Sequence, residues 1–163
     1  MTEPVLYRKW CGNGEPLLAV LRTQYEYTER MPDRATGWLY AARQIGQLLP
    51  MEWPEPLSAI GPALLDDLEF LLGIRFEAAC FQAYLDGSGV DWHYDRDWDA
   101  TAILSLGVTR DFGLRGRSGD QFPSLRDGDL LFMPPGFQHE WEHCVPVQDV
   151  TGERCSLVFR TPA

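Results

Sequence analysis

The chain has 163 residues, of which 45% are hydrophobic and 23% charged, as in a globular protein of one domain. No stretch approaches the roughly 18 apolar residues of a membrane span, and the N-terminus lacks the layout of a secretory signal, so a cytoplasmic protein is expected. The net charge of −10 argues against an extended grip on a phosphate backbone, which relies on Lys and Arg.

The first half of the chain favours helices. Residues 15–29 carry apolar side chains at helical spacing, and residues 31–56, rich in proline and aromatic residues, predict a loop around a short helix. Residues 57–73 repeat leucine and isoleucine at helical spacing, which predicts a strong amphipathic helix closed by Gly73. Residues 1–75 are therefore expected to supply helices and a lid.

The second half of the chain favours strands. Short apolar runs alternate with turns of Gly, Pro and Asp, a pattern typical of an antiparallel sandwich or jelly roll. The runs cover residues 76–84, 101–107, 110–115, 124–133 and 156–159. We predict one domain over residues 1–163, whose β core over residues 76–163 carries the chemistry.

A metal site is indicated by His93 and Asp95. In a strand, side chains two residues apart share a face, so both can reach one ion. His143, fifty residues after His93, can complete the set from a distant strand. Two histidines and one carboxylate form the facial triad of non-haem Fe(II) oxygenases, which leaves coordination positions open. By itself the His-x-Asp pair is a weak signal.

Two other metal sites need consideration. His139 and His143 match the H-E-x-x-H pattern of zinc proteases, which requires a helix. Proline at positions 134, 135 and 146 leaves little room for that helix, so His139 is either an exposed or hydrogen-bonded residue or an alternative third ligand. Cys144 could be a zinc thiolate, but zinc sites usually pair their thiolates, and the four cysteines are better explained as reduced thiols.

Arginines suggest anion binding. Arg154 and Arg160, six residues apart, can hold an organic acid beside the metal through bidentate, charge-assisted hydrogen bonds. A local patch for nucleic acid could come from Arg110, Arg115, Arg117 and Arg126. A solvated surface of mixed charge explains those four residues equally well.

The order of these motifs resembles the AlkB-like family of 2-oxoglutarate- and Fe(II)-dependent dioxygenases. The matching segments are residues 82–87, 93–97, 103–107, 112–115, 128–133, 143–146 and 154–160. The resemblance implies an α+β fold, a double-stranded β-helix (jelly roll) with N-terminal helices packed on one side. It further implies Fe(II) held by His93, Asp95 and His143, with 2-oxoglutarate and O2 as cosubstrates.

The resemblance also implies a cosubstrate site. Arg154 and Tyr84 match the positions that hold the far carboxylate of 2-oxoglutarate, and Arg160 matches one near the metal-side carboxylate. Gln82 and Ser156 stand where the family usually or often has Asn. Both can still form hydrogen bonds, so weaker or re-aimed contacts are expected rather than loss of binding.

The implied substrate is an N-alkylated base in DNA or RNA, whose oxidative demethylation releases formaldehyde, as in DNA repair. Such a base leaves its stack and sits between aromatic side chains. Trp38 and Tyr40 are candidates for that sandwich, although core packing also explains them. Asp97 matches a position that contacts the damaged base, or it is an exposed turn residue.

Other functions stay open at this point. The same chemistry could act on a protein or small-molecule substrate, or the chain could be a catalytically silent jelly-roll binding module. The intact metal and arginine motifs argue against the silent module. We expect a monomer with no membrane partner.

Overall fold

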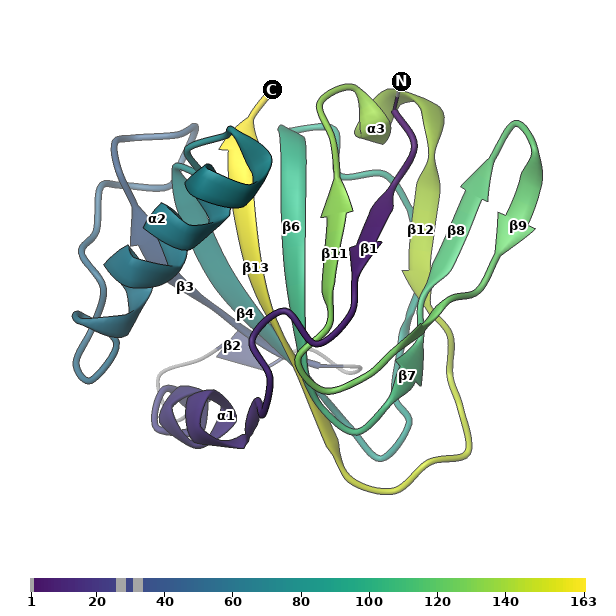
Figure 1. Cartoon of the computed structure of the whole chain (residues 1–163), viewed down its shortest axis with the longest axis horizontal. Coiled ribbons are helices and arrows are strands. Elements are labelled where there is room, and N and C mark those ends of the chain that lie inside the picture. The colour runs from purple at the N-terminus through teal and green to yellow at the C-terminus, as the bar shows by residue number, and fades with distance from the viewer. Residues whose placement is uncertain (1, 26–28, 31–33) are drawn as a thin grey trace.

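Two antiparallel sheets pack against one another in the computed structural model, which describes residues 2–25, 29–30 and 34–163. The larger sheet has the order β1-β11-β6-β13-β4-β3-β2, with bounds Val5–Tyr7, Leu130–Met133, Trp98–Gly107, Glu153–Pro162, Ala78–Leu85, Ala35–Ala41 and Glu29–Arg30. The smaller sheet has the order β5-β12-β8-β9, with bounds Val90–His93, Glu142–Val145, Gly113–Gly116 and Gly119–Gln121. A short pair joins β7 (Arg110–Asp111) to β10 (Ser124–Leu125). The arrangement is the predicted jelly roll (Figure 1).

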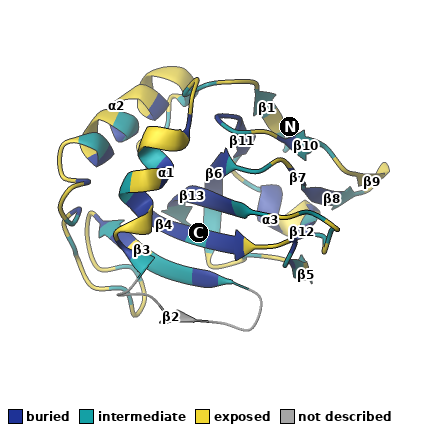
Figure 2. Cartoon of the chain, turned by 90° about the horizontal axis from the view of Figure 1, so that it is seen from below, coloured by how far each residue is buried: buried dark blue, intermediate teal, exposed yellow. Residues whose placement is uncertain are grey.

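Helices cover one face of the larger sheet (Figures 1 and 2). The helix α2 (Ile60–Leu72) buries Leu65 and Leu68 against that face, and Gly73 closes it in the left-handed conformation at φ 69°. The helix α1 (Glu15–Arg22) is shorter than the predicted 15–29. A third helix, α3 (Phe137–Glu140), has four residues. Within the described residues, no helix has both the length and the apolar character needed to cross a membrane.

The N-terminal half also supplies strands, so the prediction that residues 1–75 form helices is only partly right. β1 pairs with β11, and β3 pairs with β4, so both extend the larger sheet. The loop expected over residues 31–56 contains β3, because its aromatic and β-branched side chains fit a half-buried sheet. Residues 31–33 of that segment lie outside the described part of the chain.

Strand alternation divides the side chains of β13 between two environments. Leu157 and Phe159 point to the helix-covered face, where they join the larger core cluster. Arg154, Ser156 and Arg160 point to the other face, toward the smaller sheet, and line a cavity there. The polar residues near the C-terminus are therefore directed inward, and the sheet supplies a rigid base for a site.

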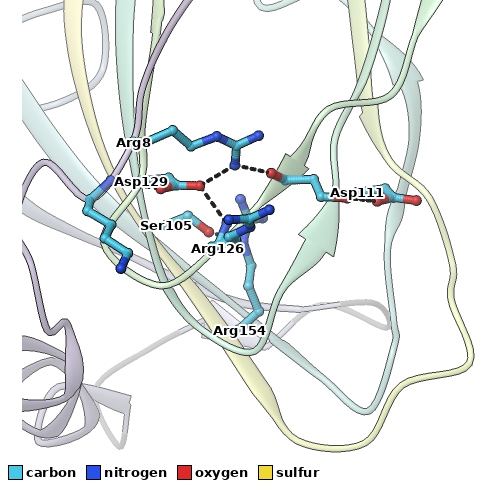
Figure 3. A network of polar contacts seen from close by, with 8 residues as sticks. Arg8, Ser105, Asp111, Arg126, Asp129 and Arg154 are labelled. Carbon is cyan, nitrogen blue, oxygen red and sulfur yellow. Dashed lines mark hydrogen bonds and ion pairs between the residues drawn. The ribbon is translucent and has the colours of Figure 1, made fainter.

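A buried carboxylate ties the N-terminal strand to the turn before β11 (Figure 3). The Asp129 side chain has no exposed surface and accepts hydrogen bonds from the Arg8 guanidinium at 2.6 Å, the Lys9 N–H at 2.9 Å and the Arg126 N–H at 2.8 Å. Burial alone would raise the pKa of Asp129, but these three donors outweigh it and lower the pKa.

We predict that Asp129→Asn lowers the free energy of unfolding by about 1.5–3 kcal/mol, since hydrogen bonds to a charged acceptor are lost in a buried setting. Because the folded-state pKa is lowered, this stabilisation is full at neutral pH and is lost as pH falls through that pKa. Urea unfolding of the wild type and the variant over a series of pH values from 7 down to 2 measures both effects, because the lowered pKa lies below the ordinary value for aspartate. Asp66→Asn is the control, since its carboxylate is 71% exposed and a change within about 0.5 kcal/mol is expected. Equal effects of the two substitutions would contradict the assignment.

Candidate metal centre

Strand pairing brings the three candidate ligands together. His143 on β12 lies directly opposite His93 at the end of β5, and Asp95 follows two residues later. The Nε2 atom of His143 lies 3.3 Å from Oδ2 of Asp95, and Nε2 of His93 lies 3.8 Å from Oδ1. One ligand atom from each residue lies within 4.8 Å of the other two. The spacing predicted from His-x-Asp and a distant histidine is thus realised in three dimensions.

The donor set fits a divalent metal ion. Bonds to His nitrogen and Asp oxygen are about 2.0–2.2 Å in zinc sites, so small side-chain rotations would suffice to bring these three atoms around one ion. Nδ1 of His93 lies 2.7 Å from the carbonyl oxygen of Asp91. If Nδ1 carries the proton, that hydrogen bond leaves Nε2 free as a ligand. Three ligands on one side of an ion leave the opposite side open.

The electrostatics favour a cation. Burial is the largest influence on Asp95 and would raise its pKa, but the hydrogen bond from His143 and the charge of Arg160 outweigh it, so the pKa is lowered. Nη1 of Arg160 lies 2.9 Å from Oδ2 of Asp95. Burial also lowers the pKa of His143. The aspartate is therefore ionised and His143 neutral near pH 7, the protonation states that bind metal.

The two alternative metal sites are excluded by geometry. The helix α3 ends at Glu140, so His139 lies on its exposed last turn while His143 is a buried strand residue. They do not share a helical turn, as a zinc protease requires. His139 does not join the ligand group and neither does Cys144, which lies next to His143 on a strand and packs near Gly113.

A cavity of about 160 Å³ lies beside the three ligands, between the two sheets. All of the predicted cosubstrate residues line it. They are Gln82, Tyr84, Arg154, Ser156 and Arg160. Apolar side chains from both sheets, among them Ile103 and Phe112, complete its walls. The sequence therefore identified residues that the fold brings to one enclosed space.

Arg154 lies buried in this cavity with only 1% of its surface exposed. Its Nε donates to Oγ of Ser105 at 3.3 Å (Figure 3), and its buried Nη2 has no partner among the described residues. Burial, followed by the charge of Arg110, lowers its pKa. A desolvated guanidinium without a carboxylate is costly, so the site fits a bound anion. The Tyr84 ring lies 5.5 Å from the guanidinium carbon, and its hydroxyl donates to Oε1 of Gln82 at 3.1 Å.

A family model agrees with this geometry: the model of the 2OG-Fe(II) oxygenase superfamily matches residues 7–160. The chain belongs to this superfamily. It is accordingly a 2-oxoglutarate-dependent Fe(II) dioxygenase, and Fe(II), 2-oxoglutarate and O2 are the cofactor and cosubstrates of its reaction. The family predicted from the motifs is confirmed.

Two curated proteins illustrate its relatives. The uncharacterized protein R406 of Acanthamoeba polyphaga mimivirus is 23% identical over 168 residues, which cover 95% of this chain and 86% of that protein. An RNA-directed RNA polymerase of apple chlorotic leaf spot virus is 32% identical over 77 residues, which cover 46% of this chain and 4% of the polymerase.

Solved structures share the fold at low identity. An oxidoreductase of the 2OG-Fe(II) oxygenase family from Burkholderia pseudomallei has a TM-score of 0.65 at 17% identity, covering 96% of this chain and 82% of that one. The structure of OsALKBH1 has a TM-score of 0.66 at 16% sequence identity, and the match covers 99% of both chains. A prolyl-4-hydroxylase from Pseudomonas putida has a TM-score of 0.69 at 17% sequence identity, and the match covers 98% of this chain and 92% of that one.

On the substrate side of the oxygenase, one predicted pair is separated. Trp38 and Asp97 line a common groove, whereas Tyr40 stacks on Trp53 in the helix-side core at a centroid distance of 5.2 Å. The sandwich of Trp38 and Tyr40 is therefore wrong. A β-bulge in β3 is the reason: Trp38 pairs with Cys80 while Tyr40 pairs with Ala79, so the two rings point to opposite faces.

The suggested arginine patch does not form either. Arg110 is 1% exposed, and its Nη2 donates to the carbonyl oxygens of residues 87, 88 and 146, so it ties two loops together inside the protein. Arg115 pairs with Asp120. Arg117 and Arg126 remain exposed.

Gln138 is a site residue that the sequence did not reveal. Its Oε1 accepts the backbone N–H of Asp95 at 3.1 Å, and the side chain is buried. It therefore fixes the turn that carries a metal ligand. Nothing in the residue type or spacing indicates this contact, which depends on the position of α3.

We predict that the oxygenase binds one Fe(II) per chain under anaerobic conditions and that His143→Ala weakens binding at least about 100-fold, because one of three ligands is lost. Chelator competition measures the affinity. The matched control is His139→Ala, which removes an exposed imidazole and leaves the affinity unchanged. A loss caused by His139→Ala, or none caused by His143→Ala, would refute this ligand set.

Proposed function

We propose that this oxygenase hydroxylates a C–H bond of an N-alkylated base in DNA or RNA, which amounts to oxidative demethylation and serves nucleic-acid repair. The observation that carries the chemistry is one cavity with a metal triad on its wall and a buried guanidinium nitrogen that has no hydrogen-bond partner among the described residues. The triad of His93, Asp95 and His143 holds the Fe(II) in this proposal.

The cavity suits a dicarboxylate with its two ends held differently. Arg154 and Tyr84 would hold the carboxylate far from the metal, since Nη2 of Arg154 finds no acceptor in the described part of the chain. Arg160, already bonded to Asp95, would lie beside the metal-side carboxylate. Gln82 and Ser156, on neighbouring strands between these arginines, can add hydrogen bonds.

The protein contributes position and protection. When bound, Fe(II) with 2-oxoglutarate and O2 supplies the oxidation, which yields succinate, CO2 and a hydroxylated carbon. Asp95 is kept ionised by Arg160, and Gln138 fixes its backbone. The buried cavity walls keep water from the reacting atoms. If the hydroxylated carbon is an N-methyl group, the N–C bond breaks and formaldehyde leaves.

Two comparisons support nucleic acid as the substrate. OsALKBH1, whose name marks an AlkB homologue, shares the fold over the whole chain, and one sequence relative is an RNA-directed RNA polymerase. The groove with Trp38 and Asp97 supplies an aromatic surface. The alternative is the same chemistry on a protein or small molecule, which the fold shared with a prolyl-4-hydroxylase keeps in view.

The function is tested by succinate and formaldehyde production. We expect single-stranded DNA or RNA oligonucleotides with one N-methylated base to yield both products in equal amounts, and unmethylated oligonucleotides to yield no formaldehyde. His93→Ala should abolish both. Succinate formed only with methylated peptides or proline-containing peptides would contradict the nucleic-acid proposal and favour the alternative.

A second prediction concerns the cosubstrate. Arg154→Met should raise the dissociation constant for 2-oxoglutarate at least about 100-fold, because charge-assisted hydrogen bonds inside a desolvated cavity are lost. The visible absorption band of the anaerobic Fe(II)–keto-acid complex reports binding. Arg126→Met, which removes an exposed guanidinium, is the control and should bind as the wild type. A band that saturates equally in both variants would remove Arg154 from the site, and no band in the wild type would favour a silent module.

A further inference from the structure

The metal cavity is small for what the reaction must assemble. Its volume of about 160 Å³ lies below the roughly 300–1,000 Å³ of pockets that enclose drug-sized ligands. It can admit a small dicarboxylate but has no room for a nucleotide as well. A groove of about 680 Å³ beside it falls within that range. Much of a larger substrate must therefore rest outside the cavity, and this groove is available.

Two indoles form the wall of the groove. Trp38 on β3 and Trp98 at the start of β6 lie with ring centroids 5.4 Å apart and planes tilted by 43°. They touch one another, so no flat ring fits between them. Trp38 is 40% exposed and presents a surface for stacking from one side. The remaining lining is Ile45, Gly46, Gln47, Leu48, Asp97, Pro162 and Ala163.

The groove adjoins the metal centre without opening onto the metal ligands. The Trp98 ring lies 5.6 Å from the guanidinium carbon of Arg160, which in turn bonds to Asp95. The backbone N–H of Trp98 donates to the backbone carbonyl oxygen of Asp95 at 2.9 Å. One guanidinium therefore separates the indoles from the metal triad. A ring stacked in the groove is next to the reacting group but is not the reacting group itself.

We propose that the groove is a subsite for a nucleobase that flanks the alkylated base in a single strand, stacked from one side on Trp38 and Trp98. This inference rests on the proposed function and specifies how the substrate is held. Stacking on aromatic side chains tolerates any base, because every base has a π-face. The acidic chain, with Asp97 on the groove, offers little attraction to phosphates.

Two measurable properties follow. A dinucleotide should be a better substrate than the mononucleoside by about 5- to 150-fold in kcat/KM, the range that one stacked base contributes. Binding should also depend weakly on salt. A protein with six to ten phosphate contacts loses about 10³–10⁵ in affinity between 50 and 200 mM salt, whereas we expect less than about 10-fold here.

The test compares an N-methylated nucleoside with the same base in a dinucleotide, using the Fe(II)- and 2-oxoglutarate-loaded enzyme. Trp38→Ala should bring the dinucleotide advantage close to 1 while the nucleoside value stays within about 2-fold of wild type. Trp98→Phe, which retains a ring, should keep part of the advantage. Phe70→Ala on α2, an exposed aromatic residue remote from the groove, is the control with the full wild-type advantage.

The outcomes separate this inference from the proposed function. If nucleoside and dinucleotide are turned over equally by the wild type, or if Trp38→Ala keeps the advantage, the flanking subsite is refuted and the demethylation proposal stands. If the binding affinity falls steeply with salt concentration, contacts to phosphates dominate binding, and the subsite is likewise refuted. If no methylated nucleoside or oligonucleotide is turned over, both proposals fail together.

Discussion

The register between β5 and β12 is the constraint on which the site depends. It sets His143 directly across from His93, and the turn after β5 then returns Asp95 to the same point. A slip of one residue would send His143 to the opposite face, because strand side chains alternate. The bulge beside this pair, between His143 and Val145, confines the change of register to the side away from the ligands.

The site contains buried positive charges, although the chain as a whole is acidic. A protein of net charge −10 buries Arg110, Arg154 and Arg160 in its interior. Arg160 is neutralised by Asp95, and Arg110 is held by backbone carbonyl oxygens. Among the described residues, Arg154 donates a hydrogen bond only to a neutral group, the hydroxyl of Ser105. Positive potential is thus concentrated at one point inside an acidic molecule, where a small anion gains most from it.

Much of the site could be predicted from sequence because it depends on local rules. Period-two alternation correctly predicted that His93 and Asp95 lie together, although β5 ends at His93 and the turn after it carries Asp95 to the same point. The prolines around His139 ruled out a metal-binding helix. The order of motifs supplied His143 and Arg154. Three features escaped prediction for physical reasons. A bulge in β3 directs Tyr40 and Trp38 to opposite faces of the sheet. Arg110, predicted on the surface, is buried and donates hydrogen bonds to backbone carbonyl oxygens of two loops. The position of α3 brings Gln138 into contact with the backbone of Asp95.

The carboxylate of Asp129 links distant parts of the molecule. It accepts hydrogen bonds from Arg8 and Lys9 in the turn after β1. The backbone carbonyl oxygen of Asp129 accepts the backbone N–H of Ser105, whose hydroxyl accepts a hydrogen bond from Arg154. Proteolytic cleavage after Lys9 would leave the Asp129 carboxylate buried without the Arg8 guanidinium. The structural change that follows would reach Ser105, which contacts Arg154. An affinity tag or a fusion partner joined at this end therefore calls for a spacer long enough to leave the first strand paired.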